Sequence, residues 1–316
     1  MRIFMTGASG CIGHYVTEAL IQQTEHDLFL LVRNPDKLKL DVKCRPGVTL
    51  LAGNMHTIEQ YADLLKTMDC AILIATCWGG ADEIYDVNVN KTHQLLNLLD
   101  SDRCQQVIYF STASILDRQN QPLKVAGEIG TDYVKSKYQC YLGLSKLAIA
   151  PKITTVFPTL IFGGDQQKPY SHISAGMGEV AKWVNIARFF QTEGSFHFIH
   201  ARDVALVVAY LVDHPPPPGA PHNLVLGNPS ITVNQALAEA CDYLHKPIYF
   251  RLPLTTQMAN FFIALFNVQM APWDRYCMEE RNQTYQNVVT PSTFKLPTYC
   301  ATVADLLKLS GVTPQD

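Results

Sequence analysis

The sequence shows no excess of charge of either sign. Its 316 residues include 25 Lys and Arg against 28 Asp and Glu, which gives a net charge of −3 and an isoelectric point near 6.4. Proteins that bind nucleic acids or acidic membranes usually carry a basic patch or a basic overall charge. The composition therefore predicts no nucleic-acid partner, and we expect a small-molecule substrate.

The sequence also has no C-x-x-C pair. Its nine cysteines are scattered and odd in number, which argues against a disulfide framework and against a zinc site. His197, His200 and Asp203 are close in sequence, but the Phe and Ile between the histidines are typical of a buried strand, so we predict no metal site. Free thiols persist in a reducing compartment, and we expect a cytoplasmic protein.

A long hydrophobic run is missing as well. The chain enters a predicted strand at Arg2, which leaves no room for a secretion signal. The apolar stretch 258–268 contains Asn260 and Asn267 and is well short of the ~20 residues that span a bilayer, so no integral membrane segment is expected. We predict that this stretch is a core or pocket-lining helix, with peripheral membrane contact as the alternative.

The first half of the sequence alternates between strand and helix patterns. Strands are predicted at residues 2–5, 28–32, 49–51, 70–75, 106–111 and 153–157. Helices are predicted between them at 12–22, 58–66, 84–99 and 133–147, and later at 202–212, 232–244, 255–268 and 302–309. Near-continuous apolar strands separated by helices indicate a doubly wound parallel α/β sheet of the Rossmann type, which binds its ligand beyond the carboxyl ends of the strands.

The regular alternation weakens after Phe157. We therefore predict a dinucleotide-binding domain over 1–162 and a smaller substrate-binding lobe over 163–316, with 196–226 returning to the first domain.

A glycine-rich turn follows the first predicted strand. Gly7 suits a tight turn, Gly10 allows the backbone to approach a pyrophosphate, and Gly13 allows the helix to pack closely.

Tyr133 and Lys137 follow the fifth predicted strand and lie four residues apart, on one face of a predicted helix. A nearby ammonium group favours the phenolate, so we expect Lys137 to lower the pKa of Tyr133 from its usual value of about 10. Tyr133 is then a candidate general acid or base.

These motifs together resemble the extended short-chain dehydrogenase/reductase family, which includes NAD-dependent epimerases and dehydratases. The resemblance covers nearly the whole chain, and the motifs occur in the family's order. They are the TGxxGxxG turn at 6–13, Tyr133 with Lys137, the strand-end motif at 110–114, and segments 86–92, 157–163 and 198–205, which resemble NVxGT, RPxxVYG and FVHVDDVA.

The resemblance implies a site. Thr112, Tyr133 and Lys137 would be catalytic. Residues expected at the cofactor are Thr6, Gly7, Ser9, Gly10, Cys11, Ile12, Gly13, Arg33, Lys37, Asn54, Met55, Ala75, Thr76, Asn88, Tyr133, Lys137, Phe157, Pro158 and Thr159. Residues expected at the substrate are Trp78, Tyr85, Thr112 and Phe162, with Trp183 as a further pocket candidate.

Several positions depart from the family pattern. Phe157 replaces a common arginine, Asn54 replaces an aspartate near the adenine, and Leu116 with Asp117 replaces the Tyr-Gly of the sugar-nucleotide enzymes. These changes favour a redox reaction over epimerisation or dehydration.

Arg33 bears on the choice of cofactor. It follows the second predicted strand, where NAD-selective relatives carry an acidic residue, and a guanidinium there can bind a 2′-phosphate. Residues 31–35 also resemble dihydroflavonol-type NADP reductases. The cofactor is therefore predicted as NADP, with NAD as the alternative. The alternative for Arg33 itself is a solvated surface residue that does not contact the cofactor.

The function predicted from the sequence is hydride transfer between NADP(H) and a carbonyl or alcohol of a small organic molecule. Two alternatives are a nucleotide-sugar epimerase or dehydratase with tightly bound NAD, and a non-catalytic NADP sensor. A homodimer is left open.

Overall fold

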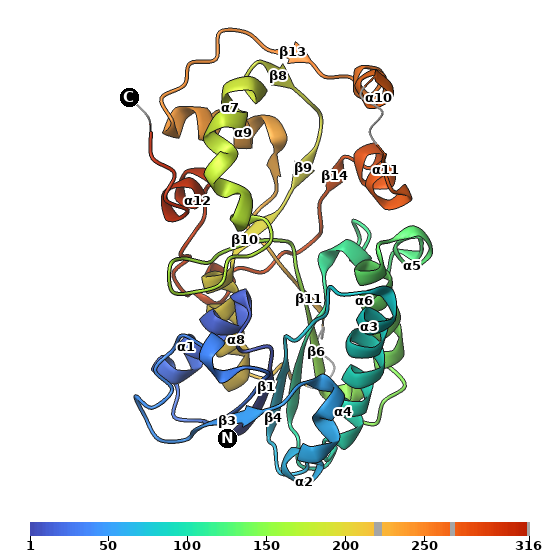
Figure 1. Cartoon of the computed structure of the whole chain (residues 1–316), viewed down its shortest axis with the longest axis vertical. Coiled ribbons are helices and arrows are strands. Elements are labelled where there is room, and N and C mark those ends of the chain that lie inside the picture. The colour runs from blue at the N-terminus through green and yellow to red at the C-terminus, as the bar shows by residue number, and fades with distance from the viewer. Residues whose placement is uncertain (218–222, 266–268, 315–316) are drawn as a thin grey trace.

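The computed structural model describes residues 1–217, 223–265 and 269–314 (Figure 1). A seven-stranded parallel sheet occupies one half of the molecule, and a smaller lobe rich in helices occupies the other. The strands of the large sheet are β1 (Arg2–Thr6), β2 (Asp27–Val32), β3 (Val48–Ala52), β4 (Cys70–Leu73), β5 (Gln106–Phe110), β6 (Ile153–Pro158) and β11 (Asn223–Leu226). The predicted doubly wound α/β fold is confirmed.

The strand order is β11-β6-β5-β4-β1-β2-β3, and every neighbouring pair is parallel. The direction of winding reverses between β1 and β4, where chains of this fold leave a crevice for a ligand. The registers Thr6↔Leu31 and Thr6↔Leu73 align the carboxyl ends of β1, β2 and β4 at one edge. This edge faces the second lobe (Figure 1).

Helices cover both faces of the sheet. On one face, α1 (Cys11–Gln23) packs along α8 (Ala201–Asp213) (Figure 1). The other face carries α3 (Ala81–Tyr85), α4 (Thr92–Leu98) and α6 (Asp132–Leu144), with α2 (Ala62–Leu65) and α5 (Lys124–Ile129) nearby. The central strands are almost fully buried between these layers, as their unbroken apolar sequences require.

The second lobe is built around helices that pack on one another and short strand pairs. Its helices are α7 (Val180–Ala187), α9 (Val233–Tyr243), α10 (Thr256–Leu265), α11 (Pro272–Glu279) and α12 (Val303–Leu309). The short strands are β7 (Leu160–Phe162), β8 (Phe190–Gln191), β9 (Ser195–Phe196), β10 (Phe198–His200), β12 (Ile231–Thr232), β13 (Leu252–Pro253) and β14 (Asn282–Gln283). Between them the chain returns to the sheet through α8 and β11.

Some elements differ from the predicted ones. The helix predicted over 84–99 is interrupted by a π-helical segment, Asp86–Lys91, between α3 and α4. The apolar stretch 258–268 forms part of α10, and its last three residues lie outside the described part of the chain. Met258 and Leu265 are 37% and 59% exposed, so the expectation of a core or pocket-lining helix is wrong for these two side chains.

Candidate active site

The glycine-rich turn has the geometry of a phosphate cradle. Gly7 adopts φ = 77°, which L side chains rarely tolerate, and a Cβ on Gly13 would lie 2.0 Å from the Gly7 carbonyl oxygen. A Cβ on Gly10 would meet only that oxygen, at 3.4 Å, and Gly10 is exposed. The turn therefore depends on glycine at 7 and 13, while Gly10 leaves an open surface beside the start of α1.

The amino terminus of α1 has the donors that a phosphate requires. Gly10 is its N-cap, and no side chain caps the helix. The first amide groups of a helix lack intrahelical acceptors and lie at the positive end of the helix dipole, so they bind anions. These residues fit the pyrophosphate of a dinucleotide.

The neighbouring segments hold this turn in place. Thr6 is buried, and its hydroxyl accepts a hydrogen bond from the Ala75 amide at 3.1 Å, which joins β1 to the residues after β4. The Cys11 thiol accepts a backbone hydrogen bond from Ser171, and burial raises the pKa of Cys11 to about 12. Gly164 donates its amide proton to the Tyr15 hydroxyl at 3.3 Å. The segment 163–174 therefore lies against the start of α1.

Two cations follow β2 at the same edge of the sheet. Arg33 and Lys37 are exposed, and neither has a carboxylate partner among the residues that the structure describes. Asn54 follows β3, and its Oδ1 accepts hydrogen bonds from the amides of His56 and Thr57. Its Nδ2 is the side-chain group left to donate to an adenine ring.

The three predicted catalytic residues converge at the end of β5. Thr112 is the second residue after that strand, and its side chain is hydrogen-bonded to the Tyr133 hydroxyl. Lys137 lies one turn after Tyr133 on α6, with Nζ 6.0 Å from the centre of the tyrosine ring. That Nζ donates to the Phe110 carbonyl at 2.8 Å, and Lys137 is only 2% exposed.

The ionisation of this pair differs from the prediction. Burial raises the pKa of Tyr133 above its usual value, and the Thr112 hydrogen bond opposes this only in part. Burial also lowers the pKa of Lys137 to about 8. The expectation that Lys137 lowers the pKa of Tyr133 is wrong for this state, because desolvation outweighs the attraction of an ammonium group directed at Phe110.

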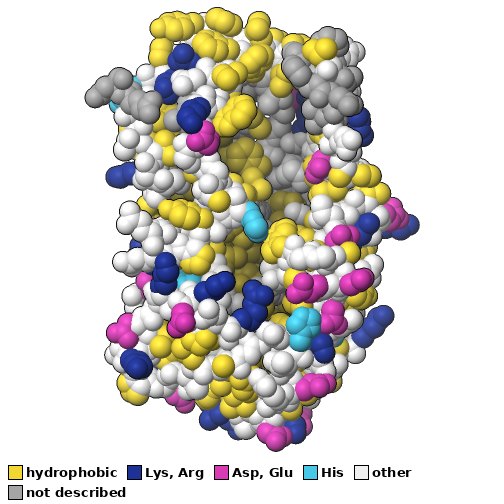
Figure 2. All heavy atoms as spheres, viewed as in Figure 1, with side chains coloured by type: hydrophobic (Ala, Val, Ile, Leu, Met, Phe, Trp, Pro, Cys, Tyr) yellow, Lys and Arg dark blue, Asp and Glu magenta, His cyan; other side chains and the backbone are white. Residues whose placement is uncertain are grey.

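An aromatic side chain covers Tyr133, the candidate catalytic tyrosine. Trp78 stacks on Tyr133 with ring centroids 3.8 Å apart, and the His172 ring lies 4.9 Å from the indole. Trp78 is nevertheless 54% exposed, so it forms a wall between the phenol and solvent. Figure 2 shows a hollow lined by hydrophobic side chains between the two halves of the molecule.

The Asn88 side chain holds the loop before Trp78 in place through hydrogen bonds. Its Oδ1 accepts from the Thr76 hydroxyl and the Cys77 amide, and its Nδ2 donates to the Cys77 carbonyl and the Ser136 hydroxyl. All four hydrogen-bonding positions of this amide are therefore used inside the protein. Asn88 joins the loop before Trp78 to the helix that carries Tyr133.

The remaining predicted residues are spread around the site. The side chains of Met55 and Phe157 are buried in the core, and the Thr159 hydroxyl donates to the Leu226 carbonyl. Phe162 packs on Phe198 in the second lobe, and Tyr85 is half-exposed on α3. Ser9 and Ile12 lie in the glycine turn and the first turn of α1, and Pro158 ends β6.

The structure overturns one pocket candidate and adds another residue. Trp183 is 68% exposed on α7, whereas its neighbour Val184 is buried, so Trp183 faces solvent rather than a pocket. His172 was not expected at the site. A histidine in an irregular segment has no periodic signal, and only the fold brings it to Trp78.

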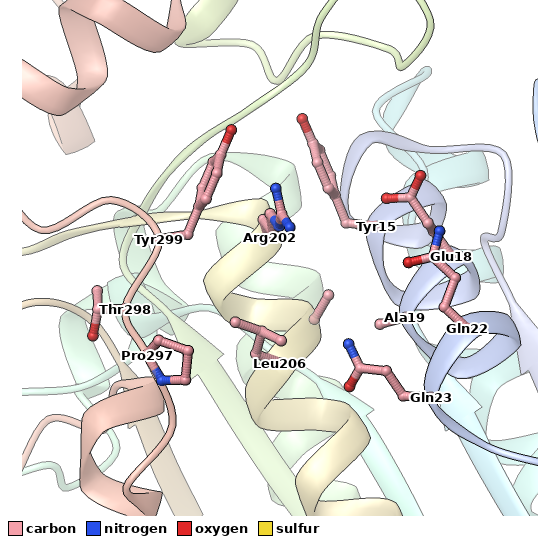
Figure 3. Close-up of a pocket in the computed structure, with 11 residues that line it drawn as sticks. Tyr15, Glu18, Ala19, Gln22, Gln23, Arg202, Leu206, Pro297, Thr298 and Tyr299 are labelled. Carbon is pink, nitrogen blue, oxygen red and sulfur yellow. The ribbon is translucent and has the colours of Figure 1, made fainter.

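A separate pocket of about 330 Å³ lies between α1, α8 and residues 297–299. Figure 3 shows Arg202 between the rings of Tyr15 and Tyr299, and its guanidinium lies 4.3 Å from the centre of the Tyr299 ring. Thr112, Tyr133 and Lys137 do not line this pocket, so it is distinct from the candidate active site.

The part of the chain that the structure describes contains no group of three or more His, Cys, Asp or Glu side chains placed to hold a metal. Within the same residues, no helix has the length and apolar character needed to cross a bilayer.

Comparison with known proteins agrees with this geometry. Residues 3–227 match the model of the NAD dependent epimerase/dehydratase family. The chain belongs to this family, and the predicted resemblance is confirmed.

Individual relatives are more distant. The sterol-4-alpha-carboxylate 3-dehydrogenase, decarboxylating, of Dictyostelium discoideum is 28% identical over 113 residues, which cover 34% of each chain. The alignment therefore spans about a third of this relative.

Two solved structures share the fold over almost the whole chain. The terminal R domain from the myxalamid PKS-NRPS biosynthetic pathway matches with a TM-score of 0.71 and 14% identity, covering 98% of this chain and 90% of that one. The dTDP-glucose 4,6-dehydratase from Bacillus anthracis str. Ames, solved in complex with NAD, matches with a TM-score of 0.63 and 14% identity, covering 99% and 96%.

Proposed function

We propose that this protein is an NADP(H)-dependent oxidoreductase that interconverts a carbonyl and an alcohol in a small organic substrate. The observation that carries the proposal is the convergence of Thr112, Tyr133 and Lys137 at the end of β5, close to the edge where the glycine turn opens. A protein that only sensed the cofactor would have no need for a tyrosine acid with these two partners.

Each residue of this group has a distinct role. Tyr133 donates the proton to the substrate oxygen, and Thr112 hydrogen-bonds the same oxygen. Lys137, held by the Phe110 carbonyl, holds the ribose of the nicotinamide. The bound nicotinamide supplies or accepts the hydride.

The ionisation of Tyr133 favours the reduction of a carbonyl. A phenol with the ordinary pKa of about 10 is already protonated near neutral pH, and burial raises the pKa of Tyr133 further, so this group starts as a proton donor. The opposite direction, alcohol oxidation, requires a phenolate to accept the proton. Reduction is therefore the reaction to test first.

The cofactor site extends from the glycine turn to the loop after β2. The amides at the start of α1 bind the pyrophosphate, and Arg33, assisted by Lys37, binds the 2′-phosphate. Two exposed cations without carboxylate partners in the described chain support this assignment. Thr6 and Asn88 act by positioning the loops around the site rather than through their own side-chain contacts.

The wall formed by Trp78 supports a flat, largely apolar substrate. The Trp78 indole covers Tyr133 at van der Waals distance and is itself 54% exposed, so it offers a planar substrate an aromatic surface beside the phenol. The partial alignment with a sterol-carboxylate dehydrogenase is consistent with an alicyclic alcohol or ketone.

A nucleotide-sugar epimerase or dehydratase is the second candidate. Its support is the family to which the chain belongs and the structural neighbours solved with NAD. Such an enzyme retains its cofactor and shows no net oxidation of it.

The two candidates are separated by one experiment. The purified protein is denatured and the released nucleotide identified, and fresh protein is then mixed with NADPH or NADH and a panel of aromatic and alicyclic ketones. Net oxidation of NADPH by a ketone supports the oxidoreductase. Tightly held NAD with no net turnover supports the epimerase or dehydratase.

A further inference from the structure

His14 is a buried polar side chain that the proposed chemistry does not use. It directly follows Gly13 near the start of α1, and its exposed fraction is 0%. Burial of an imidazole is unfavourable unless its ring nitrogens have hydrogen-bond partners. The partners of His14 therefore indicate what this side chain holds together.

The two ring nitrogens of His14 contact different segments of the chain. Nδ1 donates to the Gly10 carbonyl at 3.0 Å, and Nε2 accepts a hydrogen bond from the Lys39 amide at 3.2 Å. A carbonyl only accepts and an amide N–H only donates, so these contacts require a neutral ring with its proton on Nδ1. Burial lowers the pKa of His14, which agrees with a neutral ring. The ring thus joins the glycine turn to the segment that follows β2.

The segment after β2 carries the cations assigned to the 2′-phosphate. We name residues 33–39 the cationic segment. Arg33, Lys37 and Lys39 are exposed, and Asp36, which is also exposed, is the one acidic residue, so three cations and one carboxylate give the segment a net charge of +2. Like charges repel one another, so backbone contacts are needed to hold these side chains together before an anion binds.

The cationic segment is attached to α1 by an apolar contact and a polar one. Leu38 is 7% exposed and packs in the hydrophobic core that includes Val16 of α1. On the polar side, the His14 ring is bonded to the Lys39 amide, and the backbone of Lys37 also hydrogen-bonds this ring. Apolar packing has no fixed direction, whereas a hydrogen bond to a buried ring orients the backbone. His14 therefore sets where the cationic segment lies relative to the glycine turn.

We propose that His14 is a positioning residue for NADP(H), which keeps Arg33 and Lys37 at the correct distance from the glycine turn. The proposal rests on the NADP(H) assignment made under Proposed function. The pyrophosphate and the 2′-phosphate belong to one molecule, so both binding segments must be in register for both contacts to form. NADH lacks the 2′-phosphate and needs only the turn. Because no part of its side chain is exposed, His14 acts through the segment and not by contact with the cofactor.

Two substitutions of His14 separate its two hydrogen bonds. Asparagine places its amide near the position of Nδ1 and keeps the bond to Gly10, whereas glutamine reaches the position of Nε2 and accepts from Lys39. In calorimetric titrations, His14→Asn should weaken NADPH binding about three- to tenfold, as expected for one lost hydrogen bond, and change NADH binding less than about twofold. His14→Gln should recover most of the affinity for NADPH.

A second pair of variants tests the same bond from the surface. Lys39→Pro removes the amide proton that His14 accepts, and Lys39→Ala removes only the charge. Lys39→Pro should weaken NADPH binding more than Lys39→Ala does, with little change for NADH. Thr17→Val is the control for a buried change in α1, since the Thr17 hydroxyl donates to the Met5 sulfur on β1, and it should leave both affinities unchanged.

The outcomes distinguish this inference from the NADP(H) assignment. Equal losses for NADPH and NADH in His14→Asn would overturn the inference, because His14 would then act through the glycine turn. Wild-type affinities in His14→Asn, failure of His14→Gln to recover NADPH binding, or a Lys39→Pro protein that binds NADPH as well as Lys39→Ala does would also overturn it. The Lys39 pair decides if His14→Asn does not fold. If Arg33→Ala leaves the affinity for NADPH unchanged, the NADP(H) assignment itself fails, and this inference fails with it.

Discussion

The indole of Trp78 lies flat on the ring of Tyr133, with ring centroids 3.8 Å apart and planes 16° from parallel. This contact covers the candidate catalytic acid and adds to the burial that raises the pKa of Tyr133. The pKa of Tyr133 therefore depends on Trp78, a residue from the loop after β4 that is distant from Tyr133 in the sequence.

Removal of the indole should change the ionisation of the phenol. In Trp78→Ala, water reaches Tyr133, so its pKa should fall towards the ordinary value of about 10. Ultraviolet difference titration measures this when Trp78→Ala is compared with the double variant that also carries Tyr133→Phe. Trp78→Phe retains a ring and should give a smaller change. An unaltered Tyr133 titration in Trp78→Ala would show that the burial comes from other groups.

The glycine turn offers a pair of matched substitutions. Gly10→Val should abolish binding of the dinucleotide but leave the protein folded, because its Cβ has open space beside the start of α1. Gly13→Ala should instead destabilise the fold by about 1–3 kcal/mol or more, because its Cβ would collide with the Gly7 carbonyl oxygen. Calorimetric titration with NADPH and thermal unfolding measure the two effects. Normal dinucleotide binding by Gly10→Val would place the phosphate elsewhere.

Arg33 should select between the two nicotinamide cofactors. Arg33→Ala should weaken the binding of NADPH by roughly 1.5–3 kcal/mol and leave that of NADH nearly unchanged, because the lost contact involves only the 2′-phosphate. Lys66→Ala is a suitable control, since this exposed lysine precedes β4 and lies at the opposite edge of the sheet. Equal losses for both cofactors would contradict the NADP assignment.

The lowered pKa of Lys137 predicts that cofactor binding depends on pH. In the free protein its pKa is lowered by burial to about 8, and a bound ribose is expected to favour the charged form. The affinity for NADPH should then be constant below about pH 8 and fall by up to about tenfold for each pH unit above it. Lys137→Met should bind more weakly and lose this dependence. A wild-type affinity that stays constant up to about pH 10 would exclude a charged Lys137 from the binding step.

The sequence predicts the local features of this site well. The spacing of Gly7, Gly10 and Gly13 predicts the tight turn, because residues close together in the sequence determine its shape. Tyr133 and Lys137, four residues apart, lie on one face of the helix as expected. Both arrangements are set by short-range geometry.

Features that depend on tertiary packing could not be predicted from the short-range geometry of the sequence. The sequence predicts both Trp78 and Trp183 as pocket residues, but Trp78 covers Tyr133 and Trp183 faces solvent. The pKa of Tyr133 follows from burial by residues distant in sequence, so the proximity of Lys137 alone led to the wrong direction. Asn88 likewise shows its role only through its bonds to Cys77 and Ser136.

The most direct test of the account is the turnover of Tyr133→Phe with NADPH and the best ketone found in the panel. The substitution retains the ring beneath Trp78 and removes only the hydroxyl that donates the proton. We predict that NADPH binds with unchanged affinity while kcat falls about 10²-fold or more. Near-normal turnover by a folded, NADPH-binding Tyr133→Phe protein would show that the proton comes from another group and would contradict the proposed mechanism.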